Sequence, residues 1–316
     1  MTRQAPLIAA ISGMASLLLF LAAARAGFLA LPLFLLIPLP IVIASLGWGT
    51  VAGFLSAFMA FVAIAVIADP RIALFYGFDF ALPAAYLAHC LGLSRRDDDT
   101  GAVEWFPISH VFFRMVLYGA FAVGLSLAFS GFDPELLERA LSEQLVNAPQ
   151  NLGDGNAVSP DETARNLVAF STALLPFAAP TMWVLMIGFN LWLGARIVKR
   201  SGKMERPNLE ISDISLPPVA LLALGVGIIL ALVDPPLYFI GAALVATLGM
   251  ALTILGFNTV HVLLEGTGHK PLVLPILYLS TIFFSFPLLL MFLLGLADFG
   301  LKLRERYRAQ KNQSNT

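Results

Sequence analysis

Residues 48–68 read WGTVAGFLSAFMAFVAIAVIA, a stretch without a single charged side chain. A helix rises about 1.5 Å per residue and the hydrocarbon core of a bilayer is about 30 Å thick, so about 20 apolar residues cross it. This stretch therefore predicts a transmembrane helix. With its neighbours it predicts an all-α, polytopic transmembrane helical bundle of about 8–9 membrane segments. The other apolar stretches are 5–24, 27–46, 71–92, 105–130, 166–198, 217–233, 236–264 and 271–300.

The composition agrees with a membrane protein. Of the 316 residues, 59% are hydrophobic and 12% charged, whereas a soluble domain averages about 25% charged residues. A net charge of −1 gives no basic footprint for nucleic acid.

The single cysteine, Cys90, excludes an intrachain disulfide, and we expect it to be a small buried side chain. Nucleotide-binding, nucleophile and heme motifs are missing, so we expect no enzyme and no cofactor.

Charges between the apolar stretches predict the orientation, because short loops rich in Lys and Arg stay in the cytoplasm. Arg3 and the basic stretches 95–96 and 196–206 predict a cytoplasmic N-terminus. The acidic loop 131–163 is then expected outside. The basic tail, 302–311, should again be cytoplasmic.

The number of apolar stretches conflicts with a cytoplasmic tail. Three stretches follow residue 206, and three crossings from the cytoplasm would place the tail outside. The 236–264 stretch is too long for one upright span, and Pro287 interrupts the last stretch. We therefore expect eight full crossings and one re-entrant or surface piece, with both termini in the cytoplasm.

We expect one integral membrane domain over 1–316. It divides into a first helical half (1–130), an acidic external loop with a short amphipathic helix after Asp133 (131–163), a second helical half (164–300) and a basic cytoplasmic tail (301–316). Ser159 begins a capping box that starts the sixth helix. From Pro160 to Lys199 this helix would run about 60 Å, so it must project from the membrane or bend at Pro176 and Pro180.

Ionisable side chains inside apolar stretches are candidates for a functional or structural role, because placing a charge in lipid is energetically unfavourable. Asp79 lies near the middle of the fourth stretch. His110 and Arg114 are four residues apart on one face of the fifth. Either all three meet and face a polar cavity, or Asp79 and Arg114 form a structural ion pair that locks two helices.

A second polar cluster comprises Asn258, His261 and Glu265, which would share one helical stripe. His269 follows, but the glycines from Gly266 should end the helix first, and no HExxH pattern is present, so no metal site is expected. The alternatives are a polar helix end at the inner surface and a proton relay.

Two other polar residues, Asn190 and Asp298, lie in apolar stretches. We expect Asn190 to form a hydrogen bond between helices. Asp298 is expected to pair with Lys302 one turn later.

Small residues mark a packing face, because Gly49, Gly53 and Ala57 recur at four-residue spacing. Such a face lets helices approach closely, either within the chain or with a partner protein. Prolines at 32, 38 and 40 break the second stretch before the turn Gly47-Trp48-Gly49. A broken segment is tolerated where it is buried or lines a cavity, so this region hints at a binding site.

Several of these stretches resemble a known family. They are PLP (38–40) with GWG (47–49), NLWLGARIVKRSGK (190–203), GFNTVHVLLEG (256–266) and LLGLADFGLKLRER (293–306). Together they resemble the YybS-like family of predicted bacterial membrane proteins, whose domain has no known function. That resemblance implies the bacterial inner membrane and a distant similarity to the S components of energy-coupling-factor transporters and to MreD. It carries over no catalytic or binding residue.

Two function classes follow. A small-solute binding or transport component would bring Asp79, His110 and Arg114 to a pocket open to the outside. An MreD-like scaffold for envelope-building or signalling partners would have a filled core in which Asp79 and Arg114 pair. An intramembrane enzyme on His261 and Glu265 is a distant third. Expected partners are the lipid bilayer and membrane proteins that dock on small-residue faces, and the sequence names no ligand.

Overall fold

The computed structural model describes residues 4–25, 30–99, 101–129, 139, 142–143, 160–207 and 214–314. Within these residues the regular structure is helical apart from one antiparallel hairpin, formed by β1 (Ser94–Arg96) and β2 (Val103–Trp105). The all-α prediction is therefore confirmed.

Seven helical segments of the described chain are long and apolar enough to cross a bilayer, which confirms a polytopic bundle. They are α1 (Ala5–Ala23), α2 with α3 (Ala30–Leu35, Leu39–Trp48), α4 (Thr50–Ile67), α5 with the π-helix η2 and α6 (Pro70–Tyr76, Gly77–Ala81, Leu82–Gly92), α7 (Ile108–Phe129), most of α9 (Pro160–Arg200) and α11 (Leu237–Leu263).

The remaining apolar stretches do not make simple spans. Helix α10 (Val219–Leu230) has 12 residues, about 18 Å, which is shorter than the hydrocarbon core. Helices α12 (Lys270–Phe283) and α13 (Phe286–Leu301) meet at a bend of 120°, a broken span or a re-entrant loop. Pro287 lies in the first turn of α13, so the predicted interruption is confirmed. Counted this way, the described chain has seven spans, or eight with the bent pair.

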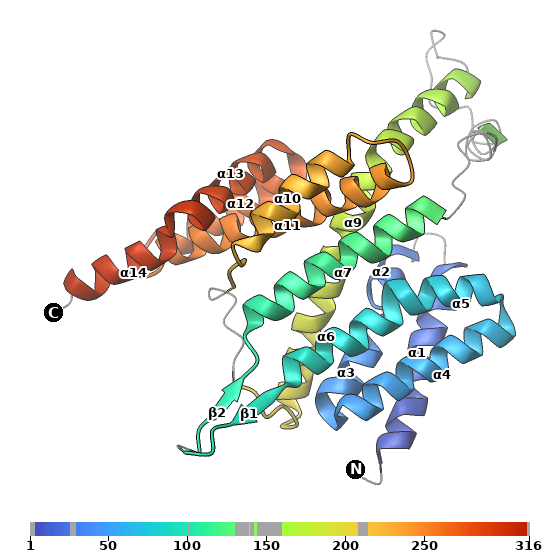
Figure 1. Ribbon diagram of the computed structural model, residues 1–316, viewed down its shortest axis with the longest axis horizontal. Coiled ribbons are helices and arrows are strands. Elements are labelled where there is room, and N and C mark those ends of the chain that lie inside the picture. The colour runs from blue at the N-terminus through green and yellow to red at the C-terminus, as the bar shows by residue number, and fades with distance from the viewer. Residues whose placement is uncertain are drawn as a thin grey trace.

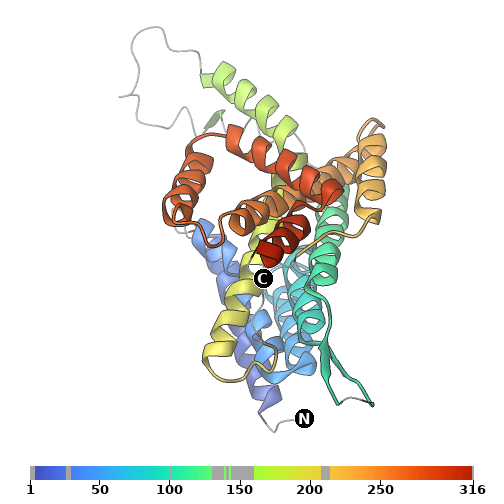
Figure 2. The ribbon, with the colours of Figure 1, turned by 90° about the vertical axis from the view of Figure 1, so that its left-hand side faces the viewer.

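Figure 1 shows the arrangement of the helices. Helices α1 to α6 form one group, α10 to α14 (Leu303–Ser314) form another, and α7 and α9 pack between them. Helix α9 has 41 residues, about 60 Å, and its first turns project beyond the other helices (Figures 1 and 2). That these turns also leave the membrane stays a prediction.

Contacts between loops establish which segments share one end of the bundle. Gln4 and Lys203 line the same pocket. The amide of Ser215 donates to Ser109 Oγ at 3.0 Å, just after the hairpin. Arg304, at the start of α14, donates to the carbonyl oxygen of Ile214 at 2.9 Å.

Gln4, the hairpin, the segment after α9 and the start of α14 therefore lie at one end. We call it the basic end. Its cations include Arg95, Arg96, Lys199, Arg200, Lys203, Arg206, Lys302 and Arg304.

The break between α2 and α3 is buried, as predicted for a proline-rich segment. Its freed carbonyl groups are satisfied by side chains of other helices. The Ser16 hydroxyl donates to the Ile37 carbonyl at 2.7 Å. The Asn190 amide donates to the Leu35 carbonyl at 2.7 Å, which confirms the predicted interhelical role of Asn190.

Some predictions fall outside the described residues. These are the amphipathic helix after Asp133 and the Ser159 cap, although α9 does begin at Pro160 as predicted. The division into two helical halves stays a prediction.

Candidate functional site

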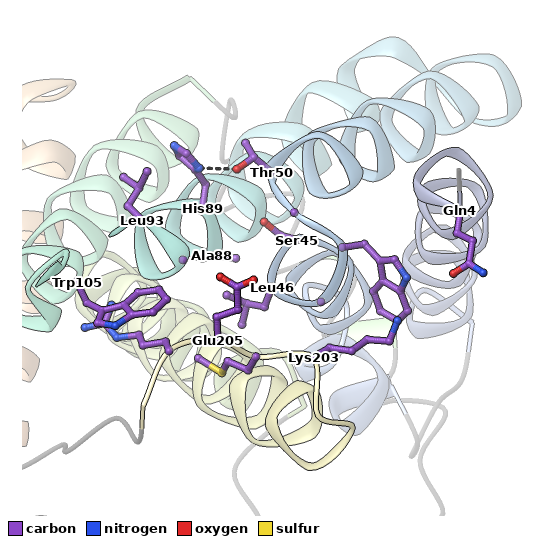
Figure 3. Close-up of a pocket in the computed structure, with 16 residues that line it drawn as sticks. Gln4, Ser45, Leu46, Thr50, Ala88, His89, Leu93, Trp105, Lys203 and Glu205 are labelled. Carbon is purple, nitrogen blue, oxygen red and sulfur yellow. Dashed lines mark hydrogen bonds between the residues drawn. The ribbon is translucent and has the colours of Figure 1, made fainter. Parts of the chain in front are cut away.

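A pocket with a volume of about 410 Å³ opens at the basic end (Figure 3). It lies where the end of α3, the start of α4, the end of α6, strand β2 and the segment after α9 meet. The polar side chains that line it include Ser45, Thr50, His89, Lys203, Glu205 and Arg206.

Glycines let α3 and α4 form the wall of this pocket. Gly49 joins the two helices with a positive φ of 94°, a conformation that favours glycine. Gly53 lies directly against Ser45, because a Cβ placed on Gly53 would come within 2.5 Å of the Ser45 Cβ. The tight hairpin of helices that results holds Trp48 at its corner, in the pocket lining.

Two cations reach the pocket from the segment after α9. The Lys203 ammonium lies 4.2 Å from the centre of the Trp48 ring. The Arg206 guanidinium lies 5.8 Å from the centre of the Trp105 ring and donates to the Leu91 carbonyl at 2.8 Å. Burial lowers the pKa of Arg206. Neither cation has a carboxylate partner among the residues that the structure describes.

Two buried polar atoms of the wall also have no hydrogen-bond partner within the described chain. They are the Ser45 hydroxyl and the Trp48 indole N–H. Leaving such a group unpaired costs about 1–3 kcal/mol, so buried polar atoms are usually paired. Nearby, Thr50 Oγ1 and His89 Nδ1 share a hydrogen bond of 2.7 Å. The wall therefore holds a hydroxyl and an N–H that are buried without a partner in the described chain.

The Glu205 side chain points into the middle of the pocket, toward Ala88 (Figure 3). Set against Lys203 and Arg206, its carboxylate leaves one net positive charge when His89 is neutral. Indole rings, hydrogen-bonding groups and an excess of positive charge suit a small, polar, anionic molecule.

Asp79 lies in η2, far from this pocket. Its side chain is 3% exposed, and Oδ2 accepts a hydrogen bond of 2.8 Å from Ser126 Oγ on α7. Its carbonyl oxygen accepts a bond of 2.7 Å from the Trp183 indole on α9. Asp79 is therefore a buried residue that connects three helical segments, through its carboxyl to α7 and through its backbone carbonyl to α9.

The predicted meeting of Asp79 with Arg114 and His110 is wrong. Arg114 donates to Cys90 Sγ at 3.4 Å and lies 4.7 Å from the centre of the Phe106 ring. Cys90 is eleven residues after Asp79, about 16 Å along the helix. His110 packs edge-on against the same Phe106 ring, at 5.7 Å.

The hairpin explains this error. It occupies the residues up to Trp105, so α7 begins only at Ile108 and Arg114 lies in its second turn. Arg114 and His110 are both exposed, and neither the predicted cavity nor the predicted ion pair forms. Cys90 is buried, as predicted.

The second predicted cluster is also divided. Asn258 is buried, whereas His261 Nε2 shares a hydrogen bond of 2.8 Å with the Tyr278 hydroxyl on α12. Helix α11 ends at Leu263, so Glu265 lies beyond it and the predicted continuous stripe is wrong. Within the described ranges, no three His, Cys, Asp or Glu side chains are grouped as metal ligands.

The small-residue stripe packs within the chain. Gly53 lies against Ser45, and Ala57 is buried, whereas Gly49 forms the turn. The stripe therefore packs within the chain, where α3 and α1 contact α4. Docking of a partner protein on small-residue faces stays a prediction.

The predicted pair between Asp298 and Lys302 is wrong as well. Asp298 Oδ2 bonds Arg304 Nε at 2.7 Å, and Oδ1 accepts from the Arg304 amide at 2.9 Å. Lys302 has a positive φ of 53° and forms the left-handed cap at which α13 ends. Lys302 pairs instead with Glu305 on the surface.

Sequence reasoning missed most of the pocket. It noted the Gly47-Trp48-Gly49 turn as a hint of a binding site, and Trp48 does line the pocket. It used Lys203 and Arg206 only to predict topology. Their sequence signal was a short basic loop. Only the structure shows that this loop lies beside the turn.

Comparison with known proteins agrees with this architecture. No curated protein and no solved structure matches the chain. Residues 14–299 match one family model, described as "Predicted membrane protein (DUF2232)". The match covers most of the chain, which therefore belongs to the DUF2232 family of membrane proteins.

Proposed function

We propose that this protein is a binding component for a small anionic solute in the inner membrane of a bacterium, with its basic end in the cytoplasm. One observation carries the proposal. Lys203 and Arg206 reach a pocket of about 410 Å³ without a carboxylate partner among the described residues.

The size and chemistry of the pocket support a small ligand. Small-molecule sites usually enclose about 300–1,000 Å³ and contain a few convergent polar groups. An anion would take its charge contacts from the two cations. The Trp48 indole N–H and the Ser45 hydroxyl have no partner in the described chain but are buried, so they would reach such an anion only after a shift of the pocket wall.

Helix architecture supports a transport role. Two of the helices that end at the pocket, α3 and α6, belong to broken segments, although the breaks themselves lie deeper in the bundle. Interrupted helices are typical of transporter binding regions, where freed backbone groups and helix ends face the substrate. The similarity to S components implied by the sequence belongs to this proposal. So does the orientation, which rests on the positive charge of the basic end.

The competing scaffold proposal predicts a partner face on the small-residue stripe or on the basic loop, and Gly53 and Ala57 of the stripe are packed within the chain. It would then depend on the basic loop after α9.

A thermal-shift screen tests the proposal. The full chain, purified in detergent, is heated with inorganic phosphate, dicarboxylates, nucleotides and sugar phosphates. Ligand at 100 times its Kd should add about 2.7 kcal/mol of stability, which raises the melting temperature. The Lys203→Gln and Arg206→Gln variants should lose this shift.

Arg95→Gln is the matched control, because Arg95 is an exposed cation of the basic end that does not line the pocket. It should keep the full shift. A shift that survives in both pocket variants, or a flat screen with every anion, would contradict the proposal.

A further inference from the structure

Two acidic side chains in the described helices are almost fully buried, and their surroundings differ. Asp298 is 4% exposed and pairs with the Arg304 guanidinium. Asp79 is 3% exposed, and the partner of its carboxyl is a serine hydroxyl, Ser126 Oγ. The same chemical group is therefore charge-balanced at one site and not at the other.

The groups packed around Asp79 carry no positive charge. On its own segment, the Tyr76 hydroxyl bonds Ser16. On α7, the Tyr118 hydroxyl donates to the Phe78 carbonyl at 3.0 Å. On α9 the neighbour is the Trp183 indole, and on α4 an aromatic ring covers Gly77. Within the described helices, no Lys, Arg or His is in ion-pair distance of this carboxyl.

Charged residues along these helices are distant. The nearest cation along the Asp79 segment is Arg71, eight residues before it, about 12 Å along the axis. Helix α7 has no cation after Arg114, and α9 has none between Arg165 and Arg196. No long side chain of a neighbouring helix is therefore placed to neutralise Asp79.

Backbone geometry singles out the same position. Asp79 is the central residue of η2, the five-residue π-helix that joins α5 to α6. Single π-turns within longer helices are rare and frequently occur at functional sites. Trp183 and Tyr118 bond the carbonyl groups of Asp79 and Phe78, so the surrounding helices hold this turn in place.

We propose that Asp79 is an intramembrane proton-binding site, whose carboxyl holds a proton while α7 covers it. A bare carboxylate with one hydroxyl donor is unfavourable among apolar side chains in a membrane, whereas a neutral carboxyl is tolerated. Proton uptake and release at such a residue is how intramembrane acids serve transporters. The inference does not depend on the pocket at the basic end.

Infrared spectroscopy of the full chain in lipid nanodiscs tests it at neutral pH. A neutral carboxyl gives a carbonyl-stretching band that a carboxylate lacks. We expect this band in the native protein and its loss in Asp79→Asn. Asp298→Asn is the matched control, because Asp298 is equally buried but paired with Arg304, and it should leave the band unchanged.

A second variant covers the case in which Asp79→Asn does not fold. Ser126→Ala removes the hydroxyl that donates to Asp79, so it should shift the frequency of the band. Absence of the band in the native protein would overturn the proposal. So would a band that persists in Asp79→Asn, or a band that Ser126→Ala leaves at its native frequency.

Discussion

The contact between α11 and α13 gives the sharpest stability prediction, because it depends on two glycines. A Cβ placed on Gly256 would overlap the carbonyl oxygen of Met291, and one placed on Gly295 would overlap that of Leu252. The backbones of the two helices therefore touch at this crossing. Neither alanine variant can be accommodated by rotating a side chain, since the obstructing atoms belong to the backbone.

The magnitude follows from two opposing effects. Alanine in place of glycine favours a helix by about 1 kcal/mol. Overpacking costs about 1–3 kcal/mol, and more when the backbone must move. Taking the upper value, Gly256→Ala and Gly295→Ala should each lower the free energy of unfolding by about 2 kcal/mol.

Gly249 supplies the control within the same helix. A Cβ at Gly249 would meet nothing within 4 Å, so Gly249→Ala should raise the stability by up to about 1 kcal/mol. Denaturant unfolding of the three variants in mixed micelles measures the difference. If Gly256→Ala were as stable as Gly249→Ala, the close crossing of α11 and α13 would be refuted.

Two further substitutions test buried polar contacts. Asp298→Asn should cost about 3–5 kcal/mol, because it removes the carboxylate that balances the buried charge of Arg304. Glu305→Gln, in an exposed pair with Lys302, should change stability by less than about 1 kcal/mol. Equal effects in the same unfolding assay would contradict a buried pair. Asn190→Leu removes the donor to the Leu35 carbonyl and should lower the melting temperature by the equivalent of about 1 kcal/mol; an unchanged melt would mean that water or another donor satisfies this carbonyl.

The sequence predicted the helices well, because hydropathy and length decide which segments cross a bilayer. The break near Pro38 and the one at Pro287 follow from the missing proline amide, and the structure has both. For Asn190 the sequence predicted a hydrogen bond between helices but not its partner. That partner, the freed carbonyl of Leu35, belongs to another helix.

Side-chain pairing could not be predicted in the same way. The hairpin of β1 and β2 lies in a short polar stretch with no apolar alternation, and it moved Arg114 away from the level of Asp79. The left-handed Lys302 similarly replaced one ion pair of Asp298 with another. Each error came from a local backbone feature that shifts the register between helices.

The pocket could be predicted only in part for the same reason. The turn at Gly49 was visible in the sequence, but the return of Lys203 and Arg206 beside it depends on how α9 packs against α3. The positive charge of a loop predicts its side of the membrane. It does not indicate which of its cations line a pocket.

The most direct test of the proposed anion site is a fluorescence titration, because Trp48 and Trp105 line the pocket and stack against its two cations. An anion that binds Lys203 and Arg206 should change the emission of both rings saturably as its concentration rises. The native protein should show this change, and Lys203→Gln should show it only at a higher anion concentration. An unsaturable change, or identical curves for the two proteins, would contradict the account.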